Sequence, residues 1–333
     1  MQWGLIGAST IASEHVIGAI RATDGQKIRS VLSSDAARGA EYARKHDIPH
    51  STTSLDEIVG DPAIAAVYVS TTNEKHFPQA MAAIAAGKHV LCEKPLAISV
   101  AEAAEMTRAA QAAGLVFATN HHLRCAGSHI AVRNLIADGR VGKVLSMRVF
   151  HAVQLPPHLQ GWRINDAAAG GGVIPDITVH DADIVRFHLR EDPVEVVARA
   201  GASGLGAGVE DSVMSVWSMP SGAMVMSHES FTHPFAGSGI EVHGTEGSIT
   251  ATGVMTQRPV GEVWLTDAQG RHRVPYDDHD LYARTLHLFV EATKGDGEPA
   301  ATGVDGVKSL AVALAVREAA RRGLATPVEY AGL

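Results

Sequence analysis

Lys94, Asp176 and His180 are side chains of this sequence whose types suit the reduction of a carbonyl group. A lysine ammonium beside a ketone can bind its oxygen and stabilise the negative charge that develops there. A histidine can protonate the resulting alkoxide, and a neighbouring carboxylate can orient the imidazole and favour its protonated form. We therefore interpret all three as candidate catalytic residues, with Lys94 or His180 as the final proton donor.

The spacing of these residues leaves structural alternatives open. Asp176 and His180 share one face if Pro175 opens a helix, but the same spacing is typical of an ordinary polar pair on a solvated helix. Lys94 taken alone could be a surface lysine in a loop. Its attachment to Pro95 after an apolar segment favours a functional role, and the bond between them could be cis.

Short apolar strands alternate with amphipathic helices through the first part of the chain, a pattern typical of a parallel sheet covered by helices on both faces. Strands are expected at residues 2–6, 27–32, 65–70, 88–92 and 115–119. Helices are expected at residues 11–22, 36–46, 74–86 and 99–113. We predict a Rossmann-type, doubly wound dinucleotide-binding domain over residues 1–122.

The pattern changes after an expected helix at residues 126–138. Strands that alternate apolar with polar residues are expected at 144–152, 194–200, 212–219, 223–230, 240–243 and 248–251, and helices at 281–293 and 305–322, with Gly323 as a C-cap. We predict that residues 123–333 form a substrate-binding and catalytic α/β domain on a large, mainly antiparallel open sheet. Its C-terminal helices can pack back on the first domain.

A loop between the first strand and the first helix stands where a G-x-G-x-x-G/A fingerprint belongs. Ser9 replaces the second glycine and Ala12 fills the third position, and small side chains still let backbone amides approach a pyrophosphate. A plain β-to-α turn is the alternative. The candidate cofactor contacts in this loop are Gly7, Ala8, Ser9, Thr10 and Ile11.

The end of the second strand distinguishes NADP from NAD. NAD sites usually carry an acidic residue here, and a carboxylate would repel a 2′-phosphate. Ser33 and Ser34 are neutral donors instead, and Arg38 can pair with phosphate. Asp35 could still be the ribose-binding acid, and Arg38 could be a solvated helix residue. We predict NADP(H) bound through Ser33, Ser34 and Arg38.

Polar residues also follow the later strands, whose carboxyl ends face the ligand crevice of a doubly wound sheet. Thr72 or Asn73 could equally cap the following helix. We assign these strand-end residues to the cofactor site: Ser70, Thr71, Thr72, Asn73, His76, Glu93, Lys94 and Asn120.

Three further motifs carry a resemblance to a known family. They are Gly87-Lys88-His89-Val90 followed by Glu93-Lys94-Pro95, Gly170-Gly171-Gly172-Val173 followed by Asp176 and His180, and Val242-His243-Gly244-Thr245-Glu246-Gly247. Over essentially its whole length, the chain resembles the Gfo/Idh/MocA family of glucose–fructose oxidoreductase and inositol dehydrogenase. The resemblance implies hydride exchange between a nicotinamide cofactor and a sugar-like ketone, with Lys94, Asp176 and His180 in catalytic roles.

The resemblance also implies binding residues in the later part of the chain. Trp162 and Arg163 are expected to approach the nicotinamide or the substrate, and Tyr282 to contact the cofactor. A packed surface pair is the alternative for Trp162 and Arg163. His151 can bind a sugar hydroxyl, although a lone histidine is more often structural. The expected substrate site comprises Lys94, His151, Trp162, Arg163, Asp176 and His180.

Within the family, residues 121–124, 150–153, 155–163 and 177–183 resemble members that reduce a sugar-derived ketone. The implied reaction is the NADPH-dependent reduction of 1,5-anhydro-D-fructose to 1,5-anhydro-D-mannitol. Two alternatives are an NAD(P)-dependent polyol, inositol or sugar dehydrogenase of the same family and a non-catalytic nucleotide-binding sensor. A third, a metal-dependent hydrolase, is not favoured.

The whole-chain properties narrow the partners. A formal net charge of −8 disfavours nucleic acid, and two cysteines suit a reducing compartment. Neither a signal peptide nor a membrane span is expected, so we predict a cytoplasmic protein that is a monomer or a homo-oligomer through its C-terminal sheet. His121, His122, Asp181 and Asp183 lack the spacing of a metal motif, so no metal is expected.

Overall fold

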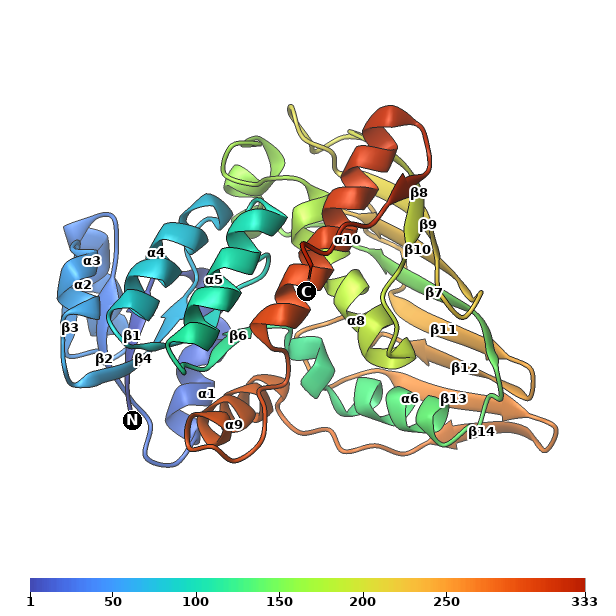
Figure 1. The fold of residues 1–333 in the computed structure, drawn as a ribbon, viewed down its shortest axis with the longest axis horizontal. Coiled ribbons are helices and arrows are strands. Elements are labelled where there is room, and N and C mark those ends of the chain that lie inside the picture. Colours follow the sequence, from blue (N-terminus) through green and yellow to red (C-terminus); the bar gives the residue numbers. More distant parts are fainter. Residues whose placement is uncertain (333) are drawn as a thin grey trace. The chain divides into compact units, whose positions relative to one another are not determined.

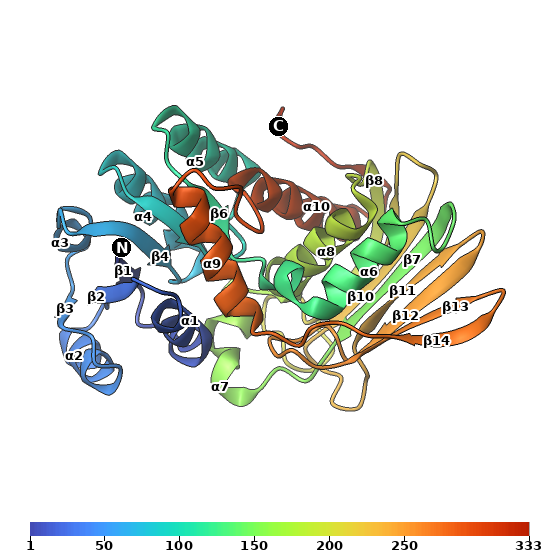
Figure 2. The ribbon, with the colours of Figure 1, turned by 90° about the horizontal axis from the view of Figure 1, so that it is seen from below.

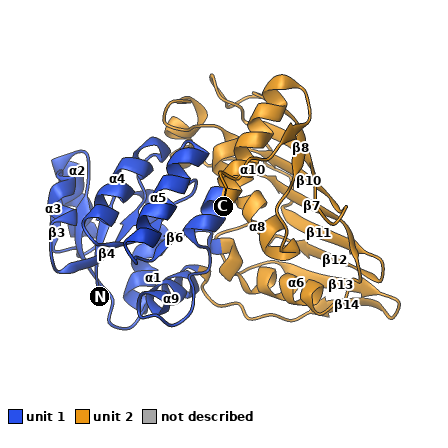
Figure 3. Cartoon of the chain, viewed as in Figure 1, with its two compact units in different colours: residues 1–122, 282–307 blue, residues 123–281, 308–333 orange. Residues whose placement is uncertain are grey.

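The computed structural model describes residues 1–332, which divide into two compact units. The first unit contains residues 1–122 and 282–307, and the second contains residues 123–281 and the chain from 308 onward (Figures 1 and 3). The expected domain boundary after residue 122 therefore coincides with a unit boundary, whereas residues 282–307 cluster with the first unit. In the described residues, no helix is long and apolar enough to cross a membrane.

The first unit is built on a six-stranded parallel sheet in the order β3-β2-β1-β4-β5-β6. Its strands are β1 (Gln2–Ile6), β2 (Lys27–Leu32), β3 (His50–Thr52), β4 (Ile64–Val69), β5 (His89–Cys92) and β6 (Phe117–Thr119). Its helical segments are η1 (Ala12–Val16), α1 (Ile17–Ala22), α2 (Ala36–Lys45), α3 (Leu55–Val59), α4 (Asn73–Ala85), α5 (Val100–Ala112) and α9 (Leu281–Thr293). Helices cover both sheet faces (Figures 1 and 2), so the predicted Rossmann-type fold is confirmed.

Local sequence explains where the helices of this unit begin. Asp35 caps α2 by accepting a hydrogen bond from the backbone N–H of Arg38. Ser99 caps α5 by accepting one from the N–H of Glu102, which matches a capping-box spacing. These caps set the turn that follows each strand, so the carboxyl ends of the strands are held in fixed positions.

The second unit is built on a nine-stranded sheet in the order β14-β13-β12-β11-β7-β10-β9-β8-β15. Its strands are β7 (Val144–Ala152), β8 (Glu195–Gly201), β9 (Ser212–Ser218), β10 (Met224–Ser230), β11 (Gly239–Gly244), β12 (Gly247–Thr252), β13 (Glu262–Asp267), β14 (Gly270–Val274) and β15 (Thr326–Pro327). Within this sheet, among the described residues, only β7 and β10 pair in parallel. The prediction of a large, mainly antiparallel sheet is therefore confirmed.

Helices cover one face of this sheet. They include α6 (Gly127–Ala137) and α8 (Val179–Leu189), which lie along the same side in Figures 1 and 2. The shorter or flanking segments are η2 (His122–Cys125), α7 (Pro157–Gln160), η3 (Gly161–Ile164), η4 (Ile174–Thr178) and α10 (Gly303–Arg322). Along β9, Val213 and Trp217 are buried while Met214 is exposed, so the strand alternates between a core face and an exposed face.

The sequence patterns did not predict β3, α3, α7, β13, β14 or β15. β3 is three polar residues long, and β14 carries mostly charged and exposed side chains, so neither shows an apolar alternation. The expected helix at residues 11–22 is present, but its first part, η1, is a π-helical turn.

Candidate active site

The loop after β1 begins with Gly7, whose φ of +119° lies in the region that favours glycine. A Cβ on Gly7 would lie 3.0 Å from the carbonyl atoms of Ser70, so a side chain does not fit there. Ser9, at the second fingerprint position, has its Oγ 2.8 Å from Ser70 Oγ and accepts a hydrogen bond from Ala12 N. This close turn at a helix start fits a pyrophosphate group.

The structure brings Ser33 and Arg38 together at the end of β2. Arg38 Nε donates a hydrogen bond to Ser33 Oγ over 3.2 Å. The Asp35 carboxylate accepts from Arg38 N over 2.7 Å, so this acid caps α2. Ser33 is buried and Ser34 is exposed, which places one hydroxyl under the guanidinium and one at the surface. The arrangement is one that can bind a phosphate.

Backbone contacts surround His76, one of the predicted cofactor residues. Its Nδ1 and Nε2 lie 2.8 and 3.2 Å from the carbonyl oxygens of Pro95 and Thr71. Burial lowers the pKa of His76, so the ring is neutral and one nitrogen carries the proton. Through these two carbonyl contacts, His76 connects the ends of β4 and β5.

Thr72 occupies the N-cap position of α4 without a capping hydrogen bond from its side chain.

The Glu93 carboxylate is held from two sides. Tyr68 Oη donates to Glu93 Oε1 over 2.5 Å, and Asn120 Nδ2 donates to the same oxygen over 2.6 Å. Burial and the Glu93 carboxylate raise the pKa of Tyr68, so its hydroxyl keeps its proton. The Lys94–Pro95 peptide bond is cis. Tyr68 was not among the site residues expected from the sequence. Its hydroxyl in an otherwise apolar strand is a signal that could have indicated a hydrogen bond to a site residue.

Tyr282 packs between two imidazole rings. The centroid of the His15 ring lies 4.6 Å from that of the Tyr282 ring, and the two ring planes are 10° apart. The centroid of the His122 ring lies 4.7 Å from that of the Tyr282 ring, with 16° between the planes. Burial lowers the pKa of His122, and the nearby Lys94 ammonium lowers it further. A neutral imidazole thus neighbours the Lys94 ammonium. Tyr282 is 1% exposed, and its contact with the cofactor remains a prediction.

In the second unit, the glycine run before α8 packs backbone against backbone. A Cβ on Gly171 would lie 2.7 Å from the carbonyl oxygens of both Trp162 and Asp166. Gly171 N donates to Asp166 O, and Gly172 N donates to Arg163 O, each over 2.8 Å. The glycines therefore fix the loop that carries Trp162 and Arg163 against the start of the helix.

Asp176 lies in η4 and His180 follows in α8. Asp176 Oδ1 is 3.5 Å from Arg163 Nε, and the guanidinium lies 4.8 Å from the centroid of the Trp162 ring. The structure thus brings three predicted site residues, Trp162, Arg163 and Asp176, together. The orientation of His180 by Asp176 remains a prediction.

His151, at the end of β7, lies close to His180, with ring centroids 6.4 Å apart. His151 Nδ1 is 2.8 Å from Asp181 Oδ1. Ser227 and Glu229 extend this polar cluster from β10. The sequence analysis assigned neither of them to the site, although two polar residues on the buried face of a strand were the available signal.

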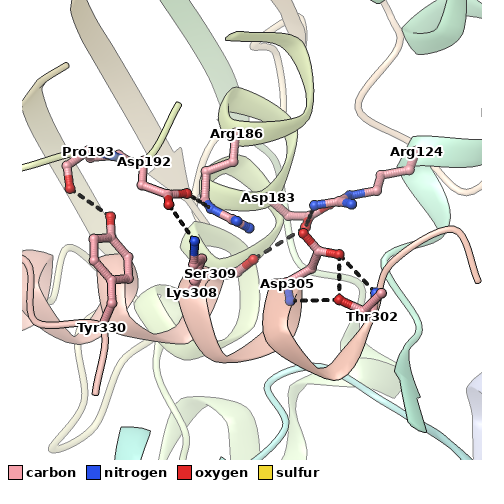
Figure 4. A network of polar contacts seen from close by, with 10 residues as sticks. All are labelled: Arg124, Asp183, Arg186, Asp192, Pro193, Thr302, Asp305, Lys308, Ser309 and Tyr330. Atoms are coloured by element: carbon pink, nitrogen blue, oxygen red, sulfur yellow. Dashed lines mark hydrogen bonds and ion pairs between the residues drawn. The ribbon is translucent and has the colours of Figure 1, made fainter. Parts of the chain in front are cut away.

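Asp183 forms an ion pair with Arg124 that uses both of its carboxylate oxygens. Arg124 Nε and Nη2 bind its two oxygens over 2.8 and 2.7 Å, and Ser309 Oγ lies 3.3 Å from Oδ1 (Figure 4). Within residues 1–332, no group of three or more His, Cys, Asp or Glu side chains could hold a metal ion.

Asp192, just after α8, forms ion pairs with two elements. It binds Arg186 of α8 and Lys308 of α10, so it connects these two helices (Figure 4).

Comparisons with known proteins agree with this fold. A family model described as "Oxidoreductase family, NAD-binding Rossmann fold" matches residues 1–121, and one for the GFO/IDH/MocA C-terminal domain matches residues 129–250. The chain is 56% identical to the 1,5-anhydro-D-fructose reductase of Ensifer adhaerens over 329 residues, 98% of each chain.

Two further relatives extend over nearly the full length. The chain is 29% identical to the inositol 2-dehydrogenase of Rhizobium meliloti, covering 97% of this chain and 98% of that protein. The crystal structure of aldose-aldose oxidoreductase from Caulobacter crescentus, complexed with glycerol, superposes with a TM-score of 0.89 at 25% identity. That match covers 98% of this chain and 99% of the other.

Proposed function

This chain belongs to the Gfo/Idh/MocA oxidoreductase family, and we propose that it reduces 1,5-anhydro-D-fructose to 1,5-anhydro-D-mannitol with NADPH. The 56% identity to a 1,5-anhydro-D-fructose reductase, which extends over 98% of the chain, is the observation that carries the proposal. The presence of Lys94, Asp176 and His180 supports a catalytic protein rather than a nucleotide sensor.

The residues at the ends of β1 and β2 support the choice of NADPH. Gly7 fits the first position of a dinucleotide fingerprint because its φ is positive and a Cβ there would collide with Ser70. The backbone amides at the helix start that follows can bind a pyrophosphate. Arg38 and Ser33 offer a guanidinium and a hydroxyl to a 2′-phosphate. Asp35, the acid that could have favoured NAD, is occupied in capping α2.

The proposed chemistry divides the work among three side chains. Lys94 binds the carbonyl oxygen and stabilises the negative charge that develops on it. When bound, NADPH supplies the hydride to the carbonyl carbon. His180 donates a proton to the alkoxide oxygen. Asp176, with Arg163 at 3.5 Å, binds a substrate hydroxyl and helps to orient His180.

The test is turnover by the purified full-length protein. We expect consumption of NADPH, followed by its absorbance, when 1,5-anhydro-D-fructose is added, and 1,5-anhydro-D-mannitol as the product identified by NMR. A panel of other ketoses and dicarbonyl sugars sets the substrate range. Absence of turnover of 1,5-anhydro-D-fructose with either NADPH or NADH would contradict the proposal.

A polyol or inositol dehydrogenase is the second candidate, favoured by the 29% identity to an inositol 2-dehydrogenase. It predicts oxidation of myo-inositol with NAD and a poor rate with NADPH. The same panel, run in the oxidative direction with both cofactors, separates the two functions. Binding of nucleotide without turnover of any substrate would instead support a sensor.

We also propose a cytoplasmic location and a monomer or a homo-oligomer formed through the sheet of the second unit. The chain has two cysteines, both buried, and so few thiols suit a reducing compartment. Met214 and Met224 are 57% and 60% exposed on adjacent strands of that sheet, which gives a second copy an apolar surface to cover. Sedimentation of the purified protein measures its oligomeric state.

A further inference from the structure

Asp181 and Glu229 form a buried pair of carboxyl groups behind His151. Both are 0% exposed. Glu229 on β10 is the direct cross-strand partner of His151 on β7, so their side chains lie on the same sheet face. Ser227 lies two residues earlier on that face, and α8 brings Asp181 onto it. Both carboxyl groups contact the hydroxyl of Ser227.

Ionisation of both Asp181 and Glu229 is unfavourable, because two negative charges would lie close together in a buried site. Burial raises the pKa of Asp181, and burial together with the Asp181 charge raises the pKa of Glu229. Ser227 Oγ lies 2.5 Å from Glu229 Oε1 and 3.4 Å from Asp181 Oδ2, so its one proton goes to Glu229, and the carbonyl oxygen of a neutral acid can accept it. Asp181 Oδ1 faces His151 Nδ1 over 2.8 Å, a contact that suits an imidazole N–H and a carboxylate. Because this contact falls on Asp181, and because the Asp181 charge raises the pKa of Glu229, we place the negative charge on Asp181 and the proton on Glu229.

We propose that Asp181, with Glu229 kept neutral behind it, fixes the proton of His151 on Nδ1 and thereby sets Nε2 to bind a hydroxyl of a polyhydroxylated ketone. Nε2 accepts a hydrogen bond while the ring is neutral and donates one once the ring is protonated. Asp181 and Glu229 are positioning residues, because they act through His151. This inference rests on the proposed function for the class of substrate.

The other titratable groups that face His151 do not replace this charge. The His180 ring lies 6.4 Å away on α8. His129, on α6, is neutral because burial lowers its pKa to about 4, and His151 contributes to that lowering. Asp181 and Glu229 are acids that lie beside His151, the first by a direct contact and the second as its cross-strand partner. Removal of the Asp181 charge should therefore destabilise the protonated imidazole and release the fixed tautomer.

The experiment is an NMR titration of full-length protein labelled with ¹⁵N-histidine, with the His151 signals assigned from a His151→Asn variant. We expect neutral His151 to carry its proton on Nδ1. Asp181→Asn should lower the midpoint of the His151 titration by about one unit or more, because an opposite charge at hydrogen-bond distance is lost. Glu229→Gln should shift that midpoint by less than half as much, since a neutral amide replaces a neutral acid.

Glu318→Gln is the matched control, because it removes an exposed carboxylate from the same unit. It should leave the His151 midpoint unchanged. The proposal is overturned if neutral His151 carries its proton on Nε2, if Asp181→Asn leaves the His151 midpoint unchanged, or if Glu229→Gln lowers that midpoint by half as much as Asp181→Asn or more. The position of the His151 proton is measured in the parent protein, so it decides the matter even where Asp181→Asn does not fold. Because the titration needs no turnover, an inactive protein with the expected titration would contradict the proposed function and leave standing only the positioning of the His151 proton by Asp181.

Discussion

The guanidinium of Arg38 donates a hydrogen bond through Nε to the hydroxyl of Ser33 over 3.2 Å. The two residues come from different elements, the first turn of α2 and the end of β2. Asp35 accepts a hydrogen bond from the backbone of α2, and the Arg38 guanidinium and the Ser33 hydroxyl are donors at this strand end. This relationship is the structural basis for the proposed preference for NADPH over NADH.

Arg38→Ala should weaken NADPH binding by about 10- to 100-fold, the range for losing a charge-assisted hydrogen bond to phosphate. NADH binding should change little, because NADH has no 2′-phosphate. Titration of both cofactors by fluorescence measures the two dissociation constants. Arg44→Ala, in the last turn of α2, is the control. Equal losses for both cofactors would show that Arg38 does not read the phosphate.

Lys94→Ala should retain NADPH binding and lose about 100- to 1,000-fold in kcat, as expected when one group that stabilises a developing oxyanion is removed. Single-turnover kinetics with saturating NADPH and ketone would measure the loss. Lys75→Ala removes an exposed lysine of the same unit and should keep the parent rate. A Lys94→Ala rate equal to that of the parent would exclude the assigned role.

Asp211 should make the protein sensitive to acid. Burial alone would raise its pKa, but hydrogen bonds from the backbone N–H groups of residues 203–206 and from the Ser203 hydroxyl lower it to about 2. The unfolded value is about 3.9, so this stabilisation is present above that pH and is lost as the pH falls towards 2. Denaturant unfolding measured across this range should show the decline.

Asp211→Asn should lower the free energy of unfolding at neutral pH by about 1.5–3 kcal/mol, because charge-assisted hydrogen bonds are weakened. The difference from the parent should shrink as the pH approaches 2. Asp296→Asn, at an exposed position, is the control. A constant difference at every pH would mean that Asp211 does not titrate as the geometry implies.

His129 should destabilise the fold as the pH falls from about 6.5, the unfolded value, to about 4. Burial lowers its folded pKa to about 4, because His129 is enclosed between His188 Nε2 and the carbonyl of Val254. The unfolded chain therefore takes up a proton that the folded chain refuses. The pH dependence of unfolding gives the proton uptake, and an NMR midpoint for His129 near 6.5 would contradict the prediction.

Local patterns predicted much of the fold. The strands Gln2–Ile6, Lys27–Leu32 and Val144–Ala152 were expected with the bounds that the structure has, because each is a continuous or alternating apolar run. Segments without such a run were missed, as in β3 and β14. Residues 282–307 cluster with the first unit. The sequence allowed the C-terminal helices to pack back on the first domain, but no local pattern fixes which residues do so.

The sequence by itself determined which residue types stand at the strand ends and helix starts, and hence the candidate roles of Lys94, Arg38 and His180. Only the tertiary structure decided which partners those side chains have. The parallel pairing of β7 with β10 sets Glu229 beside His151, and the folding of α8 brings Arg124 to Asp183, 59 residues away in the chain. Local propensity depends on neighbours within a few residues, whereas charge pairing and burial depend on groups that meet only when the chain has folded.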